Sequence, residues 1–316
     1  MTKFERINME NVPPYSVMIC IVLAAMFFFA RAPIIIVSDE LFTAVYGAKR
    51  EHYRYIEMTA RLFRQVKIVR MAIDAQPDTV AFAIKDASKR PHFVVFPYRY
   101  ISALQIYTQN TPKIKCFVLS DYITSKIYNN AKTDTAGAQL INTGIGIDYY
   151  RAGLCTGIIS KLKIKDAEGK KINDINNTVL YFPSGDQNLD ESFYQGVKKI
   201  SSGSAIIDFQ KDVTDLSKTY KSTVLLQSAT NEYMRSNNKF DTKLIVRSWI
   251  DPEYTPPNTV AVFDDSPIML LPKIAKLRYK KISEDPIEIP CEINFMFTRI
   301  DDIKILLSLV QVVMAR

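Results

Sequence analysis

Residues 92–119 read HFVVFPYRYISALQIYTQNTPKIKCFVL, and this stretch decides the fold class. Its two ends, 92–96 and 115–119, are short apolar runs rich in Val and Phe, which is typical of buried strands. The segment between them, Tyr98–Tyr107, is predicted to be a helix. Fully apolar strands that alternate with helices predict a parallel sheet covered by helices on both faces.

The same alternation continues towards the N-terminus. A strand at 33–37 (PIIIV) precedes a long helix at 40–63, whose apolar positions recur at spacings of three and four. A second strand at 67–73 and a helix at 77–87, opened by a proline, complete the series. Residues 33 to about 145 are therefore predicted to form one doubly wound α/β unit.

A second α/β unit is predicted from residue 146 onwards. Its expected strands are 178–182, 205–209, 244–249 and 259–263, its expected helices are 148–162, 189–200, 213–234, 268–277 and 301–314, and 288–297 is expected to be extended. No flexible linker separates the two units, so we interpret them as lobes joined by short hinges. The predicted domains are lobe 1 at 33–145 and lobe 2 at 146–316, with a return of the C-terminal part to lobe 1 left open.

The chain begins with a strongly apolar segment. Tyr15–Ala30 reads YSVMICIVLAAMFFFA, carries no charge and follows the basic residues Lys3 and Arg6. This pattern predicts a signal peptide or signal anchor over residues 1–32, with the rest of the chain outside. A buried core helix is disfavoured because the run has no polar face. Pro33 follows the small-residue site where cleavage would occur and tends to block it.

Composition narrows the function. The chain has 41 Lys and Arg against 33 Asp and Glu, a formal net charge of +8. These basic residues are scattered singly or in pairs, which indicates a solvated basic surface and not a nucleic-acid groove. A further interpretation is that these basic residues attract the protein to anionic lipid headgroups of an adjacent membrane.

No catalytic motif or metal site is recognisable. Cys116, Cys155 and Cys291 are widely spaced and are interpreted as buried small hydrophobic residues. His52 and His92 have no Cys, Asp or Glu at metal-ligand spacing. Phosphate-binding loops, dinucleotide-binding glycines and a nucleophile elbow are also missing from the sequence. We therefore expect a protein that is not an enzyme and carries no cofactor or metal.

Polar and aromatic residues follow the predicted strands. In open α/β sheets a ligand lies beyond the carboxyl ends of the strands. The candidate ligand-binding residues at these ends are Asp39, Tyr98, Asp121, Ser184, Asp186, Trp249, Asp251 and Asp264. Carboxylates, hydroxyls and aromatic rings suit a polar ligand with apolar faces.

Simpler roles stay open for some of the candidate residues. Asp186, Asp190 and Glu191 could form a carboxylate cluster, but they stand where acidic residues stabilise a helix N-terminus. Trp249 could fill the core between sheet and helix. Asp264 and Asp265 could form a turn in which their side chains point apart.

Two stretches of the second unit carry a resemblance to a known superfamily. Gly146–Leu154 (GIDYYRAGL) and Thr259–Pro267 (TVAVFDDSP) are similar to segments of the type I periplasmic-binding-protein superfamily, which includes sugar-binding proteins and the effector domains of lac-repressor-type regulators. The resemblance implies two lobes around a small-molecule ligand and allows an ABC-type membrane transporter as a partner. Two departures matter: Phe193 stands where sugar-binding members usually have arginine, and the helix-turn-helix of the regulators is absent.

The predicted function is that of an exported or membrane-anchored ligand-binding protein. It would bind a small polar metabolite between two lobes by hinge closure. Its expected location is periplasmic or otherwise extracytoplasmic. Residues 15–30 would either hold it in contact with the membrane or direct its secretion. No nucleic-acid partner is expected. Two alternatives remain open: an envelope interaction protein that kept the fold but lost the ligand, and a membrane-tethered transferase or hydrolase.

Overall fold

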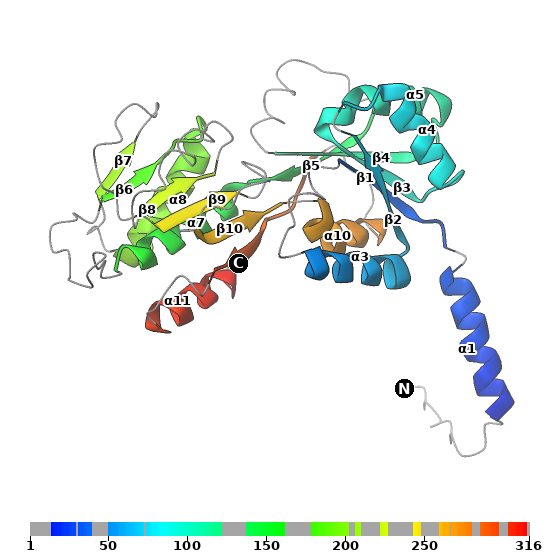
Figure 1. The fold of residues 1–316 in the computed structure, drawn as a ribbon, viewed down its shortest axis with the longest axis horizontal. Coiled ribbons are helices and arrows are strands. Elements are labelled where there is room, and N and C mark those ends of the chain that lie inside the picture. Colours follow the sequence, from blue (N-terminus) through cyan, green and yellow to red (C-terminus); the bar gives the residue numbers. More distant parts are fainter. Residues whose placement is uncertain are drawn as a thin grey trace, which may run out of the picture.

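The computed structural model has two α/β lobes and an apolar helix that projects from the first of them (Figure 1). It describes residues 14–29, 31–39, 50–72, 74–121, 137–161, 178–201, 206–209, 222–226, 243–247, 259–265, 267–279, 285–296 and 303–314. Each lobe is built around a six-stranded sheet.

Lobe 1 contains an entirely parallel sheet in the order β11-β5-β4-β3-β1-β2. Its strands are β1 (Ile34–Asp39), β2 (Val66–Met71), β3 (Phe93–Pro97), β4 (Lys115–Asp121), β5 (Gln139–Thr143) and β11 (Ile287–Glu288). Its helices are α3 (Arg50–Arg64), α4 (Pro77–Ala87), α5 (Ile101–Asn110) and α10 (Pro267–Lys276), with short 3-10 turns at η3 (Tyr98–Tyr100) and η5 (Leu277–Tyr279).

The central strand β1 shows why helices cover both faces of this sheet. Ile34 and Ile36 pack in the cluster that includes residues of α3 and α10, whereas Ile35 and Val37 pack in the cluster that includes residues of α4 and α5. Successive side chains of a strand point to opposite faces. An uninterrupted run of β-branched residues therefore supplies two cores at once, as the apolar strands predict.

Lobe 2 repeats this arrangement, with its sheet in the order β12-β10-β9-β8-β6-β7. Its strands are β6 (Thr178–Tyr181), β7 (Ile206–Phe209), β8 (Ser222–Leu225), β9 (Lys243–Arg247), β10 (Thr259–Asp264) and β12 (Glu292–Phe295). Its helices are α7 (Gly146–Ile159), α8 (Gln187–Ser201) and α11 (Ile303–Met314). The edge strand β12 is antiparallel to β10, so this sheet is mixed and not purely parallel.

Two glycines let α7 and α8 pack closely in lobe 2. A Cβ built on Gly153 would lie 2.1 Å from the carbonyl oxygen of Phe193, and one built on Gly196 would lie 2.1 Å from that of Tyr150. No side chain fits at such separations, so glycine is required on both helices. The contact places α7 inside the lobe, and its residues 151–159 are all buried.

Most predicted elements of the described residues are present, with one error. The predicted helix at 213–234 is wrong at Ser222–Leu225, which forms β8 between β6 and β9. The β-branched residues Thr223 and Val224 suit a strand, and pairing on both sides outweighs the local helical reading. The first part of the predicted helix at 40–63 lies outside the described residues.

The apolar segment forms α1 (Pro14–Phe29), whose described side chains include large apolar residues in exposed positions. Among the described residues, no helix combines the length and the apolar character needed to cross a membrane.

Candidate functional site

The two lobes are joined where the chain passes three times between the two sheets of the described structure. The first crossing leads from β5 into α7, at 143–146. The second leads from β10 into α10, at 264–267, and the third runs from β11 to β12, at 289–291. Both β5 and β10 enter a crossing at their carboxyl ends, so the carboxyl edges of the two sheets meet at the hinge (Figure 1).

A buried hydrogen bond joins the first two crossings. Thr143, the last residue of β5, donates from Oγ1 to Oδ2 of Asp265 over 3.0 Å. Its neighbour Asp264 is also buried, and its Oδ2 lies 3.4 Å from Nδ2 of Asn294 on β12. The two adjacent aspartates thus form hydrogen bonds with different residues.

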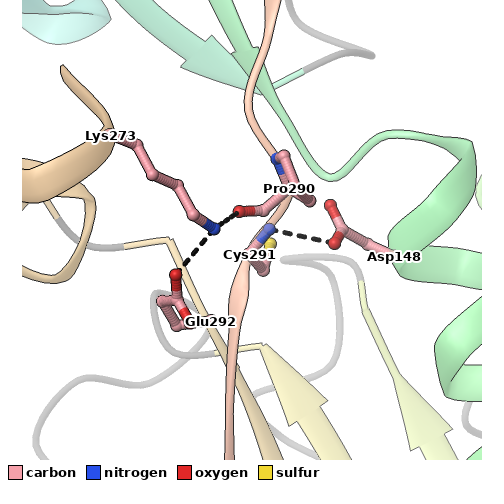
Figure 2. Close-up of polar contacts among 5 residues, drawn as sticks. All are labelled: Asp148, Lys273, Pro290, Cys291 and Glu292. Carbon is pink, nitrogen blue, oxygen red and sulfur yellow. Dashed lines mark hydrogen bonds and ion pairs between the residues drawn. The ribbon is translucent and has the colours of Figure 1, made fainter. Parts of the chain in front are cut away.

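Asp148 joins the first and third crossings (Figure 2). This side chain is 2% exposed and lies in the first turn of α7. Its Oδ1 accepts a hydrogen bond from the backbone N–H of Cys291 over 2.9 Å, and its Oδ2 accepts one from the N–H of Ile145 over 3.1 Å. One carboxylate therefore caps the start of α7 and also binds the backbone of the third crossing at Cys291.

A lysine of lobe 1 reaches the same crossing from the other side. Nζ of Lys273, on α10, donates to the carbonyl oxygen of Pro290 over 2.7 Å. The same Nζ forms an ion pair of 2.7 Å with Oε1 of Glu292, on β12 of lobe 2 (Figure 2). The hinge is thus fixed by polar contacts between residues far apart in the chain.

The strand order identifies a second position at these carboxyl edges. Lobe 1 has the order β2-β1-β3-β4-β5 and lobe 2 the order β7-β6-β8-β9-β10. In each sheet the second strand pairs on one side of the first strand and the third strand pairs on the other side. The switch points therefore lie between β1 and β3 in lobe 1 and between β6 and β8 in lobe 2. Ligands of doubly wound folds bind at such switch points. Each switch point lies two to three strands from the hinge, about 10–14 Å at the usual strand spacing.

Candidate residues of lobe 1 lie along this edge. Asp39 ends β1 and Tyr98 follows β3, so they flank the switch point. Asp121 ends β4 and is in register with the hinge residue Thr143. Tyr98 is partly buried and packs against the core between the sheet, α4 and α5.

Among the described candidate residues of lobe 2, Ser184 and Asp186 follow β6 and Asp264 ends β10. Hydrogen bonds to neighbouring residues occupy Ser184 and Asp186. The Ser184 hydroxyl donates to the carbonyl oxygen of Asp186 and accepts from its N–H, and the Ser184 N–H donates to Asp190. Asp186 accepts from the N–H groups of Asn188 and Leu189, so it caps α8. The helix-stabilising role of these acids is therefore present in the structure. Trp249 and Asp251 lie outside the described residues.

Two stacked aromatic residues, Tyr181 and Phe193, lie next to the hydrogen-bonded residues Ser184, Asp186 and Asp190. Phe193 is fully buried and stacks on Tyr181, with ring centroids 4.0 Å apart and an interplanar angle of 6°. The Tyr181 hydroxyl donates to Oδ1 of Asp190 over 2.6 Å. Burial and this hydrogen bond to a carboxylate raise the pKa of Tyr181, so the phenol stays protonated as a donor.

The hinge residues Thr143, Asp148, Asp265, Lys273 and Glu292 are absent from the residues that the sequence predicts for the site. Asp148 does occur in the GIDYYRAGL segment, three residues after Ile145, a spacing compatible with capping. Nothing local in the sequence marks the others, because their partners lie on a different part of the chain.

Structural comparison shows which known proteins share this architecture. An ABC transporter solute-binding protein from Conexibacter woesei matches with a TM-score of 0.53 and 11% identity, over 90% of this chain and 95% of that one. A transcriptional activator of the comK gene from Bacillus halodurans also matches with a TM-score of 0.53, at 10% identity, over 90% and 97% of the two chains. No protein-family model and no curated sequence matches the chain. The likeness concerns the fold, which these two proteins put to different uses.

Proposed function

We propose that this chain, which has the two-lobed fold of the type I periplasmic-binding-protein superfamily, binds a small polar metabolite between its lobes and performs no chemistry on it. The observation that carries the proposal is the meeting of the carboxyl edges of both sheets at a hinge of three crossings. A doubly wound sheet binds ligands at this edge, and here two such edges adjoin.

The ligand would lie along the switch points of both sheets. The proposed ligand-binding residues are those predicted from the sequence: Asp39, Tyr98, Asp121, Ser184, Asp186, Trp249, Asp251 and Asp264. Of those with described side chains, Tyr98 and Asp186 retain partial exposure, whereas Ser184 and Asp264 are buried. Tyr98 and Asp186 are therefore the strongest candidates for direct contact in this form of the protein.

Hinge closure is the proposed mechanism. The ligand would contact both lobes only when they approach, so it would stabilise the closed arrangement by its differential affinity for that state. The crossings are short, which favours rotation of the lobes as units over rearrangement inside them. The ion pair between Lys273 and Glu292 lies at the third crossing and would change if the lobes rotate.

The apolar segment supports export or anchoring at a membrane. Its 16 residues give a helix of about 24 Å, against about 30 Å for the hydrocarbon core of a bilayer. A short helix is accommodated by local thinning of the bilayer and by flanking basic side chains that extend to the headgroups. An extracytoplasmic location follows from this proposal, with an ABC-type transporter as the proposed recipient of the ligand.

A thermal-shift screen tests the ligand-binding proposal. The full chain in neutral detergent would be heated with sugars, nucleosides, amino acids and purines. A ligand at about 100 times its Kd adds roughly 2.7 kcal/mol, which raises the midpoint by several degrees. A hit should lose affinity in Asp186→Ala and in Tyr98→Ala, and should persist in the control Lys198→Gln on the exposed surface of α8. A folded protein that responds to no compound, or a hit indifferent to both variants, would contradict the proposal.

Phe193 favours a second candidate, an interaction protein that kept the fold and lost the ligand. Sugar-binding members of the superfamily usually have arginine at this place, and here a stacked, fully buried aromatic ring replaces it. A buried ring offers no charge or hydrogen bond to a ligand. If no compound in the screen shifts the thermal midpoint, and cross-linking captures a stable complex with another envelope protein, the role of an interaction protein would be favoured.

A further inference from the structure

We propose that a basic pocket at the base of α1 binds the phosphate group of an anionic phospholipid and holds lobe 1 against the membrane surface. The proposal rests on the membrane anchoring put forward above and assigns a second site, separate from the hinge. Arg31 precedes β1 and Gln65 precedes β2, so the pocket lies at the amino edge of the sheet. The hinge lies at the opposite, carboxyl edge.

The pocket has a volume of about 200 Å³ and is lined by three cationic and two aromatic side chains. The cations are Arg31, Lys276 and Arg278, and the aromatic residues are Phe63 and Tyr279. No Asp or Glu is among the described residues that line it. Pockets that enclose drug-sized ligands measure about 300–1,000 Å³, so this one suits a single phosphate group better than a whole metabolite.

The positive charges of the pocket are close enough to affect one another. Arg278 donates from Nη2 to the carbonyl oxygen of Ala32 over 2.9 Å, which brings its guanidinium to the segment that holds Arg31. Burial lowers the pKa of Arg278, and the charge of Arg31 lowers it further. A bound anion would relieve this repulsion. The dipole of α10 explains a cation at Lys276 in its last turn, but it does not explain Arg31.

The position of Arg31 relates the pocket to the bilayer. Arg31 is two residues beyond Phe29, the last residue of α1, and two residues span at most about 7 Å. The headgroup layer on each side of a bilayer is about 5–8 Å thick. With α1 inserted, the pocket therefore lies at the depth of the lipid phosphates.

Exposed apolar residues surround the cations. Phe63 is 68% exposed and Tyr279 is 78% exposed, and aromatic rings of this kind are enriched where membrane and water meet. On α3, Tyr55, Met58 and Leu62 are also exposed and recur at helical spacing. A helix that combines such a row with basic residues is typical of a membrane interface.

Short-chain lipids test the proposal on the full chain in neutral detergent. Short-chain phosphatidylglycerol should raise the thermal midpoint in a saturable manner, whereas phosphatidylcholine of the same chain length should not. Each basic residue at an anionic surface contributes about fivefold to binding, so Arg31→Gln combined with Lys276→Gln should weaken the phosphatidylglycerol response about 30-fold. Both side chains are exposed, and the bond from Arg278 to Ala32 is left intact. The single variants, each expected to weaken binding about fivefold, serve if the double variant is less stable.

A matched control removes the same charge from lobe 2. Lys198→Gln combined with Lys199→Gln lies on exposed positions of α8 and should leave the response unchanged. An equal loss in this control, or an equal response to both lipids, would overturn the proposal. Stabilisation by inorganic phosphate that matches phosphatidylglycerol would also overturn it, in favour of a site for free phosphate.

The anchoring itself is measured separately. Retention of the expressed chain in membranes after a sodium carbonate wash supports anchoring, whatever the lipid titration gives. Retention without a phosphatidylglycerol response removes the pocket proposal alone. Complete release by carbonate removes the anchoring on which the pocket depends.

Discussion

Replacement of Asp148 by Asn tests whether one carboxylate holds the hinge together. In the native protein each of its two oxygens accepts a backbone N–H, one from Ile145 and one from Cys291. Asn keeps one acceptor oxygen and presents an NH2 group in place of the other. One of the two N–H groups then faces a donor in a site where the native side chain is 2% exposed.

The expected cost follows from that geometry. A hydrogen bond to a charged group contributes about 1.5–3 kcal/mol, and a buried N–H left without an acceptor costs about 1–3 kcal/mol. These contributions overlap, so we expect Asp148→Asn to lower the free energy of unfolding by about 2–4 kcal/mol. Asp186→Asn is the matched control because Asn caps a helix about as well as Asp, and we expect a change below about 0.5 kcal/mol.

Urea unfolding at pH 7, followed by circular dichroism, measures both variants. Amide hydrogen exchange supplies a local readout, since the N–H groups of Ile145 and Cys291 should lose protection in Asp148→Asn and keep it in the control. A loss below about 1 kcal/mol, with both amides still protected, would refute the assignment of Asp148 as the residue that joins the first and third crossings.

Three further outcomes are expected. Gly153→Ala should cost about 3 kcal/mol or more in urea unfolding, because its Cβ would lie 2.1 Å from the carbonyl oxygen of Phe193 and force α7 away from α8; a mild effect would contradict the close contact. Burial raises the pKa of Cys116 and Cys155 to about 12, so in a Cys20→Ser background neither thiol should react with iodoacetamide at pH 8 until urea is added. Burial lowers the pKa of His92 below 6.5, so as the pH falls the unfolded state binds a proton at His92 before the folded state does. The contribution of neutral His92 to the free energy of unfolding is therefore complete above pH 6.5 and is lost as the pH falls. His92→Gln should therefore lose less stability than the native protein between pH 7 and pH 5, and equal losses would exclude this role.

The sequence predicts those parts of the fold that local patterns determine. The apolar residues 34–37 of β1 are recognisable as a strand because all of them are buried, so the sequence is apolar at each of these positions. The predicted helix is wrong at Ser222–Leu225 because this segment becomes a strand through its pairing with β6 and β9, which are distant in sequence. Cys116 is buried as predicted. This prediction does not depend on a contact with any residue that is distant in sequence.

The same distinction between local features and long-range contacts applies to the candidate site. The ends of strands are local features, so positions such as Asp121 and Asp264 at the carboxyl edges could be predicted. The hinge contacts could not, because Asp148 and Cys291 are 143 residues apart and Thr143 and Asp265 are 122 apart. No periodicity within one segment encodes a contact of that kind.

The contacts of the hinge also limit which chemistry the ligand site offers. Asp148 and Asp265 accept hydrogen bonds that join the crossings, and Asp264 is buried beside Asn294. In the proposed site, the polar recognition of a ligand would then depend on the switch points, where Asp39 ends β1 of lobe 1 and Asp186 follows β6 of lobe 2. Asp186 also caps α8, so it would serve both roles. Ionised carboxylates only accept hydrogen bonds, so the proposed site would favour a ligand rich in hydroxyl or ammonium donors over an anion. The pocket at the amino edge of lobe 1 has the opposite charge, so the two proposed sites should not compete for the same molecule.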